Sequence, residues 1–286
     1  MRPWLWLRVG PILCLGMILL PPCAHGADEE GVTKDLHPWG RFYNHRGAWK
    51  RYRVVTETLD AAGQVAGTSI TETKTSLEEA DDEGVTLRVE SIVEIAGKRL
   101  SAEPKRVRQG LRGDGAIGKA VVRNVGAGHV VIEGQKIPCR VEEAEIDGPN
   151  GKTVTRTYYS RFLPPYVLQR ESKTTGPDGK VVEEHSFRVL SLDRPCAVVP
   201  QIRRAAWVEA VSTTPNGSTV TRAYTSIKVP GGVICHDTDE RDPQGRLVRH
   251  SRLVLLDFGL EPDKEEGADL GRVRGRGRRA NRAGSP

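Results

Sequence analysis

The sequence lacks the motifs that usually mark a catalytic site. It contains no Gly-x-Ser-x-Gly elbow, no Gly-x4-Gly-Lys-Ser/Thr phosphate loop and no His-Glu-x-x-His pair. These arrangements create a nucleophile, hold a phosphate or bind a catalytic zinc ion. We therefore expect a protein that is not an enzyme and that uses no cofactor. If an activity is hidden, the places to look are the Gly- and Arg-rich stretch 104–127 and the segment around His236.

Cysteine is also scarce. The chain has five cysteines. Two of them, Cys14 and Cys23, lie within the first 26 residues, which leaves Cys139, Cys196 and Cys235 in the rest of the chain. Three cysteines form at most one disulfide. Two alternatives are open. A bridge between Cys139 and Cys196 would close a loop of nearly 60 residues, or all three are buried thiols that act as small apolar side chains.

Long apolar runs are absent except near the N-terminus. Arg2 and Arg8 flank the start of the chain, Val9–Leu20 is an apolar run of 12 residues, and Ala24-His25-Gly26 follows. This order is typical of a secretory signal peptide over 1–26, cleaved before Ala27. A retained anchor and lipidation at Cys23 are the alternatives. A bilayer span needs about 20 apolar residues, so we expect a periplasmic or secreted protein without a transmembrane span in the mature chain.

An excess of positive charge is absent from the body of the protein. The net charge of the whole chain is +6, but residues 271–286 hold six arginines and no acid, the leader holds two arginines, and residues 27–270 have a net charge of −2. The basic character therefore belongs to a tail. We expect residues 261–286 to be disordered and dispensable for folding, and we expect no nucleic-acid partner.

The most informative feature that the sequence does contain is an internal repeat. Residues 139–192 and 205–258, 66 positions apart, are identical at 17 of 54 positions. Random matching at roughly 5% per position would give about three identities, so the repeat is real. Pro149-Asn150-Gly151 recurs as Pro215-Asn216-Gly217, and Thr153-Val154-Thr155-Arg156 recurs as Thr219-Val220-Thr221-Arg222.

Each repeat predicts a four-stranded antiparallel meander. In the first copy the strands are expected near 137–146, 153–161, 166–175 and 180–192, with turns that contain Asn150-Gly151 and Asp178-Gly179. Asn-Gly and Asp-Gly are strong hairpin signals because they tolerate positive φ angles. The fold class is therefore all-β: a large curved antiparallel sheet, a half-barrel or open barrel, built from tandem meander repeats. About eleven or twelve strands are expected, and such a sheet must curl, close or split.

The pattern divides the mature chain into units. They are an N-terminal cap at 27–47, a diverged first β unit at 48–103, a Gly/Arg-rich connection at 104–128, repeat A at 129–193, repeat B at 203–260 and the tail at 261–286. Apolar residues gather at one end of each expected hairpin, for example Val141, Tyr158 and Val167, whereas the turns at the other end are charged. We expect long hairpins with a packed base and a polar tip.

Several polar groups could be read as sites, but each has a simpler interpretation. The stretch Cys235–Asp242 has the composition of a metal site, yet the matching stretch Gln169–Thr175 has no ligand set, so a charged hairpin arm is expected and no metal. His185 and His250 are expected on strand surfaces. Only Glu143 of the Glu142, Glu143 and Glu145 group recurs, as Glu209, which does not support a carboxylate pair. The recurring Arg156/Arg222 and Tyr158/Tyr224 are expected to serve the fold, with arginine covering the Tyr ring or a neighbouring strand.

The strand pattern resembles the lipoprotein-carrier superfamily of the bacterial periplasm. The resemblance is carried by the hairpin into Ile137-Pro138-Cys139-Arg140-Val141, by Tyr158-Tyr159-Ser160 and by Pro164-x-x-Val167, and it covers about residues 48–258. The stretch Trp39-Gly40-Arg41-Phe42 with Gly47-Ala48-Trp49 is similar to the start of uncharacterised exported bacterial proteins. The resemblance implies a curved half-barrel whose partners are a lipid, a lipoprotein or another envelope protein.

The two functions that we weigh are non-enzymatic. The first is the binding of an apolar or extended ligand on a curved β sheet in the cell envelope. The alternative is a structural or protein-interaction module that binds no small ligand. Exposed apolar surface on the concave face would favour the first, and a filled core would favour the second.

Overall fold

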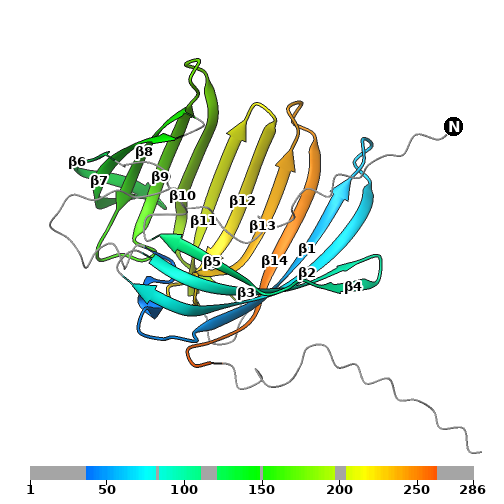
Figure 1. Cartoon of the computed structure of the whole chain (residues 1–286). Helices are drawn as coiled ribbons and strands as arrows, with labels where there is room; N and C mark the ends of the chain where they lie inside the picture. Colours follow the sequence, from blue (N-terminus) through cyan, green and yellow to red (C-terminus); the bar gives the residue numbers. More distant parts are fainter. Residues whose placement is uncertain (1–36, 82–83, 111–120, 149–150, 197–203, 263–286) are drawn as a thin grey trace, which may run out of the picture.

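The computed structural model describes residues 37–81, 84–110, 121–148, 151–196 and 204–262, and they form one open antiparallel sheet (Figure 1). The predicted all-β class is thereby confirmed. The expected leader at 1–26 and most of the expected tail lie outside the described residues. Helix η1 is a single 3-10 turn at Gly40–Phe42. The strands are β1 Trp49–Leu59, β2 Val65–Asp81, β3 Gly84–Ile95, β4 Lys98–Ser101, β5 Lys105–Gly110, β6 Val121–Ile132, β7 Gln135–Gly148, β8 Gly151–Tyr159, β9 Val167–Thr175, β10 Val181–Pro195, β11 Arg204–Thr214, β12 Gly217–Thr225, β13 Val233–Arg241 and β14 Leu247–Gly259.

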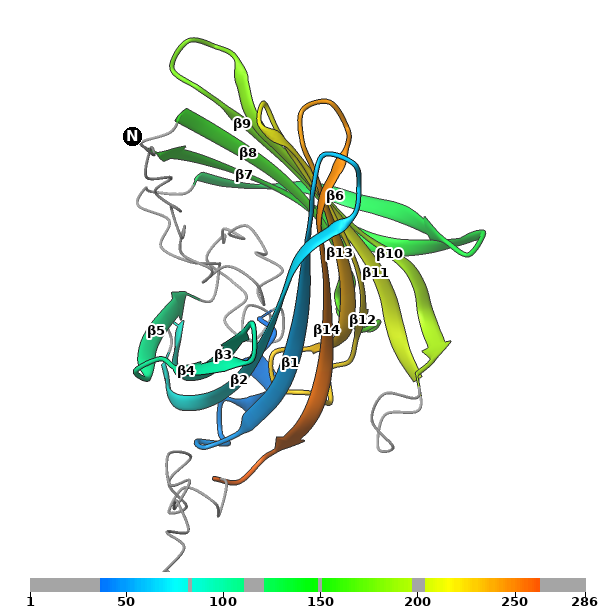
Figure 2. The ribbon, with the colours of Figure 1, turned by 90° about the vertical axis from the view of Figure 1, so that its right-hand side faces the viewer.

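The order of the strands places the first strand beside the last. The sheet runs β4-β3-β2-β1-β14-β13-β12-β11-β10-β9-β8-β7-β6, and β5 pairs with β3. Strands β1, β2 and β3 follow β14 in the sheet in the same way as β11, β12 and β13 follow β10. The third unit expected at 48–103 stays a prediction. The β1–β5 end of the sheet curls over to one side (Figure 2).

The sheet has 14 strands instead of the expected eleven or twelve. The extra strands come mainly from the stretch around 104–128, where a connection was expected and where the structure has β5 and the first part of β6. Both strands lie at the margins of the sheet, where solvent reaches the side chains. Charged residues and glycines are tolerated there, so the apolar alternation that identifies a strand is weak.

A long row of residues crosses one face of the sheet. Residues directly opposite each other in neighbouring antiparallel strands point to the same face, and the register connects eight strands in this way. From β10 to β3 the row is Val189, Val208, Ala223, His236, Leu253, Val54, Thr71 and Val93. All of these residues are buried except the last two, Thr71 and Val93, which are half-buried. We call this face, on which Trp39 and Phe42 also pack, the inner face.

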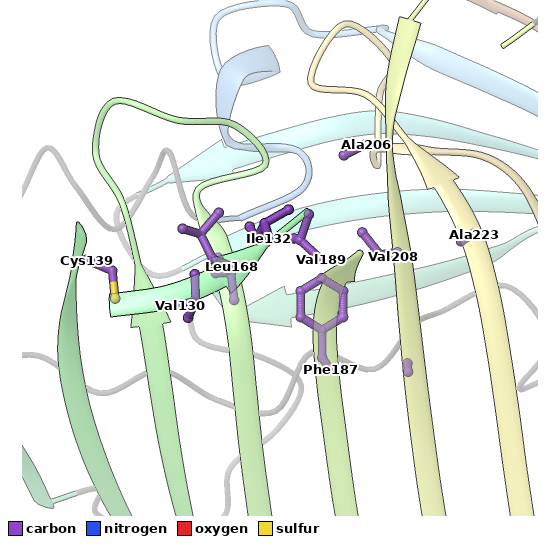
Figure 3. Close-up of a cluster of buried hydrophobic side chains, with 11 residues drawn as sticks. Val130, Ile132, Cys139, Leu168, Phe187, Val189, Ala206, Val208 and Ala223 are labelled. Carbon is purple, nitrogen blue, oxygen red and sulfur yellow. The ribbon is translucent and has the colours of Figure 1, made fainter. Parts of the chain in front are cut away.

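Two segments pack on the inner face. At one end, Trp39 and Phe42 of the N-terminal segment contact Leu77 and Leu87 of β2 and β3. At the other end, Val130 and Ile132 of β6 join Leu168, Phe187, Val189 and Val208 in the largest apolar cluster (Figure 3). Between them, Tyr52, Val54 and Leu253 form a smaller cluster with Val233. The apolar side chains therefore form several clusters along the curved sheet.

The opposite, outer face carries a row of alternating charges. The register places Arg188, Glu209, Arg222, Asp237 and Arg252 opposite one another on β10–β14. Glu209 accepts hydrogen bonds from Arg188 at 2.6 Å and from Arg222 at 2.9 Å. Burial alone would raise the pKa of Glu209, but the bonds from the two arginines outweigh it and lower the pKa.

The other repeat contains the same ion pair. Arg156 of β8 donates to Glu143 of β7 at 2.9 Å, at the positions that correspond to Arg222 and Glu209. The recurrence of the arginine together with the glutamate is thus explained by a cross-strand pair. Of the two expected roles, the arginine covering the Tyr ring or a neighbouring strand, the pairing with β7 fits the second, and Arg156 also interacts with Tyr158.

Glu209→Gln is expected to lower the free energy of unfolding by about 2 kcal/mol, because it removes one charge from a buried group held by two arginines. The matched control is Glu143→Gln, whose side chain is more exposed and is bound by one arginine. We expect it to cost about 0.5 kcal/mol. Urea unfolding of both variants measures the two values, and equal losses would contradict the difference in burial.

Candidate functional site

A buried lysine lies on the inner face of β1. Lys50 is in phase with Tyr52 and Val54, so the alternation of the strand directs it to the same side as these core residues. Only 8% of Lys50 is exposed. Its Nζ atom lies 5.7 Å from the centre of the Trp39 ring and 5.6 Å from the centre of the Tyr52 ring. Two aromatic rings therefore stabilise the ammonium group by cation–π interactions.

The loop between β12 and β13 approaches the same amine. Gly231 has a φ angle of +72°, and a Cβ atom at this position would lie 2.5 Å from Lys50 Nζ and 3.1 Å from Trp39 Nε1. The Gly231 N–H donates to the carbonyl of Pro38 at 3.2 Å. The absence of a side chain at Gly231 therefore lets the loop, the N-terminal segment and β1 meet around the lysine.

The electrostatic environment of Lys50 is unusual. Burial lowers its pKa to about 8. In the part of the chain that the structure describes, no carboxylate forms a salt bridge with Lys50, whereas Glu209 and Glu143 each pair with arginine. A buried charge without a counter-ion is costly, and such residues are concentrated at functional sites.

Two neutral histidines lie in the same region. Burial lowers the pKa of His236 to about 4, with Asp237 opposing and Lys50 reinforcing the shift. Burial also lowers the pKa of His37 to about 4. The Nδ1 atom of His236 lies 2.9 Å from the Thr238 hydroxyl, and the Trp39 N–H donates to Nδ1 of His37 at 3.2 Å. Neither histidine supplies negative charge to Lys50.

The inner face is more accessible to solvent on the parts of β2 and β3 next to Lys50. Val89, Ser91 and Val93 of β3 are half-buried, as is Thr71 of β2. Ser91 and Thr73 share a hydrogen bond of 3.1 Å between their hydroxyls. The inner face of β1–β3 thus offers apolar and hydroxyl groups next to a cation, whereas Val54, Leu253 and Val208 farther along the row are 3% exposed or less.

The candidate metal segment divides between the two faces of β13. His236 points to the inner face, whereas Cys235 and Asp237 belong to the outer-face rows. Among the described residues no group of three or more His, Cys, Asp and Glu side chains could hold a metal ion. His236 corresponds in the repeat to Arg170, which is 2% exposed and donates from Nε to Thr157 at 3.2 Å. Both repeats thus place a basic residue at this buried position.

The remaining polar candidates have separate partners. Glu142 accepts a hydrogen bond from the Tyr159 hydroxyl at 3.0 Å, Glu143 pairs with Arg156, and Glu145 pairs with Lys152 at 2.6 Å. His250 lies 2.8 Å from Asp239 on the half-exposed surface. His185 is half-buried, and burial lowers its pKa. The expectation of a surface position therefore fits His250 better than His185.

The three cysteines are free thiols in the structure. Cys139 belongs to the cluster around Phe187, and Cys196 belongs to a different cluster with Ala205 and Ile234. Burial, together with the nearby Cys196, raises the pKa of Cys235 to about 11, which disfavours a reactive thiolate. The Cys139–Cys196 bridge stays a prediction, and thiol counting on the unfolded, unreduced protein decides it: one free thiol supports the bridge, and three exclude it.

Lys50 was not found from the sequence because no motif surrounds it. The signal that could have found it is its position in the alternation of β1, where it falls on the same side as Tyr52 and Val54. A lysine in register with the apolar positions of a strand must either be buried or interrupt the core. The partners that make it unusual, Trp39 and Gly231, come from segments far apart in the chain, and only the fold brings them together.

No helix among the described residues is long and apolar enough to cross a membrane.

Comparison with known proteins gives no family. No family model matches the chain, and no curated protein matches it. Two solved structures are similar in outline. One is a protein of Bacteroides fragilis described as exported with a YmcC-like fold, with a TM-score of 0.29, 11% identity, and coverage of 75% of this chain and 96% of that chain. The other is a DUF1329 family protein of Desulfovibrio piger, with a TM-score of 0.30, 10% identity, and coverage of 81% and 93%.

Proposed function

We propose that this chain is a non-enzymatic protein of the cell envelope that binds an apolar or extended ligand on the inner face of its curved sheet. The observation that carries the proposal is the change in burial along the inner row. From Val189 to Val54 the row is a filled core, but at Thr71 and Val93 it becomes half-buried. Half-buried apolar and hydroxyl groups on a curved, rigid surface are what a weakly polar ligand needs.

The ligand would lie along β1–β3. Val89 and Val93 supply apolar contacts on β3, and Thr71 and Ser91 supply hydroxyls that can bond a polar group of the ligand. Ordered strands hold these groups in place, so little conformational entropy is lost when the ligand binds. The buried part of the row, around Val208, gives the sheet its stability and would not contact the ligand.

The alternative function is a protein-interaction module, and one observation favours it. Strand β6 ends the order of strands in the described sheet, and it exposes Val121, Val125 and Val131, each more than half exposed. An edge strand with exposed β-branched residues can pair with an extended segment of another protein. In this case the inner face would serve only as a core.

A pair of adjacent substitutions on β3 tests the proposal. Val93→Arg places a charge on the half-buried inner face, and Ile92→Arg places the same charge on the outer face, where the side chain is also half-buried. The measurement is a fluorescence titration with N-phenyl-1-naphthylamine, an apolar probe. We expect Val93→Arg to weaken binding at least tenfold and Ile92→Arg to leave it unchanged. A wild-type protein that does not bind the probe, or equal effects of the two variants, would exclude the inner-face site.

A further inference from the structure

We propose that Lys50 binds the anionic headgroup, a carboxylate or a phosphate, of an amphiphilic ligand whose apolar chain lies along the inner face of β1–β3. This inference rests on the proposed function and specifies the chemistry of its ligand. It is carried by a side chain that is more than nine-tenths buried, that has no ion-pair partner among the described residues, and that lies beside a half-buried surface.

The position of Lys50 fits a headgroup site. The residue directly opposite Lys50 on β2 is Thr75, and Thr75 in turn lies opposite Val89 on β3. Lys50 therefore stands in the same row as the first half-buried valine of β3. Val93 lies four residues farther along β3, which is about 13 Å at the rise of a strand. A chain of that length can run from the ammonium group to the open part of the row.

The surroundings of Lys50 favour an anion over other ligands. Trp39 and Tyr52 present their ring faces to the amine, and Gly231 brings backbone against it. These groups contact the ammonium group but do not neutralise its charge. His37 and His236 are neutral at pH 7 because burial lowers the pKa of each to about 4. An oxyanion would supply the missing negative charge, and in a site of low polarity a charge-assisted hydrogen bond is short and strong.

The surroundings of Lys50 do not favour a covalent reaction of its amine with a carbonyl compound. Such a reaction needs a general acid or base near the amine, and His236 instead contacts Thr238 through Nδ1. The cation–π contacts also stabilise the protonated amine, which is not nucleophilic. The protonated state is the one that binds an oxyanion.

The test compares charged and uncharged ligands with the same chain. The ligands are hexadecanoate, hexadecyl phosphate and methyl hexadecanoate, and each displaces N-phenyl-1-naphthylamine from the wild-type protein and two variants. Lys50→Met keeps most of the length of the unbranched side chain and removes the charge. Lys74→Met is the matched control, because Lys74 also lies 5.6 Å from a tryptophan ring, that of Trp49, but in a half-buried position. Removing an unpaired buried charge favours the folded state, so Lys50→Met is expected to fold and to melt at a higher temperature.

We expect the wild-type protein and Lys74→Met to bind at least one of the two anions at least tenfold more tightly than the methyl ester. In Lys50→Met the anions should bind no better than the ester, with the affinity for the ester unchanged. A preference for hexadecanoate or for hexadecyl phosphate identifies the carboxylate or the phosphate. Equal binding of anions and ester by the wild-type protein, or an anion preference that survives in Lys50→Met, overturns the inference while the proposed function stands. If neither the probe nor any of the three ligands binds, the proposed function itself is wrong.

Discussion

Lowering the pH from 7 to 4 is expected to remove several kcal/mol from the free energy of unfolding. His37 and His236 have a pKa of about 4 in the folded protein and the ordinary value of 6.5 when unfolded. Between these values the unfolded state binds more protons, so stability is complete above pH 6.5 and is lost as the pH falls toward 4. A shift of this size corresponds to about 3 kcal/mol for each histidine, which is a large fraction of a typical total.

Histidine variants separate this effect from general acid denaturation. His236→Gln should lose about half of the pH dependence between 6.5 and 4, because glutamine does not take up a proton. His250→Gln, in which a half-exposed histidine beside Asp239 is replaced, should keep the wild-type dependence. The measurement is urea unfolding at pH 7, 5.5 and 4. An unchanged slope in His236→Gln would contradict the burial of a neutral imidazole at this position.

Val208→Asp is expected to prevent folding or to lower the melting temperature by more than 15 °C. Val208 is 1% exposed and lies in the largest apolar cluster, between Ala223 and Val189 of the neighbouring strands. A carboxylate at this position would lose its hydration, and the cost of burying it is several kcal/mol. Circular dichroism during heating measures the loss.

The control for this variant is three residues away on the same strand. Val211 faces the outer side of β11 and is half-buried. Val211→Asp introduces the same charge in the same strand, but water can reach it, so the loss should be about 1 kcal/mol. Similar losses in the two variants would mean that the inner and outer faces are not distinguished as the register indicates.

The repeat made the centre of the sheet predictable. The expected strands near 137–146, 153–161, 166–175 and 180–192 correspond to β7–β10, which extend a few residues farther at several ends. Asn-Gly and Asp-Gly turns mark where the hairpins reverse. Because the same strand pattern occurs twice, it is not a chance arrangement of apolar and polar residues. The margins were less predictable. Strands β4, β5 and β6 are exposed over much of their length, and their charged residues and glycines resemble a connection.

The packed base of the hairpins was expected, but the burial of polar groups was not. Thr155, Thr238 and Ser251 are all buried on the inner face, where cross-strand pairs such as Thr221 with Thr238, at 2.9 Å, satisfy the hydroxyls. Their polar character made these positions look solvated in the sequence. Lys50 was missed for the same reason, because a lysine is expected to be solvated. Its burial depends on Trp39 and Gly231, which approach it only in the folded chain.

The central claim is that the inner face holds a ligand, and native mass spectrometry tests it most directly. The full-length chain is expressed in a bacterium, purified without detergent, and measured before and after extraction with an organic solvent. The account predicts an adduct of a few hundred daltons on the wild-type protein that extraction removes and that Val93→Arg lacks. A wild-type protein that carries no adduct and takes up neither hexadecanoate nor its methyl ester when these are added would contradict the account.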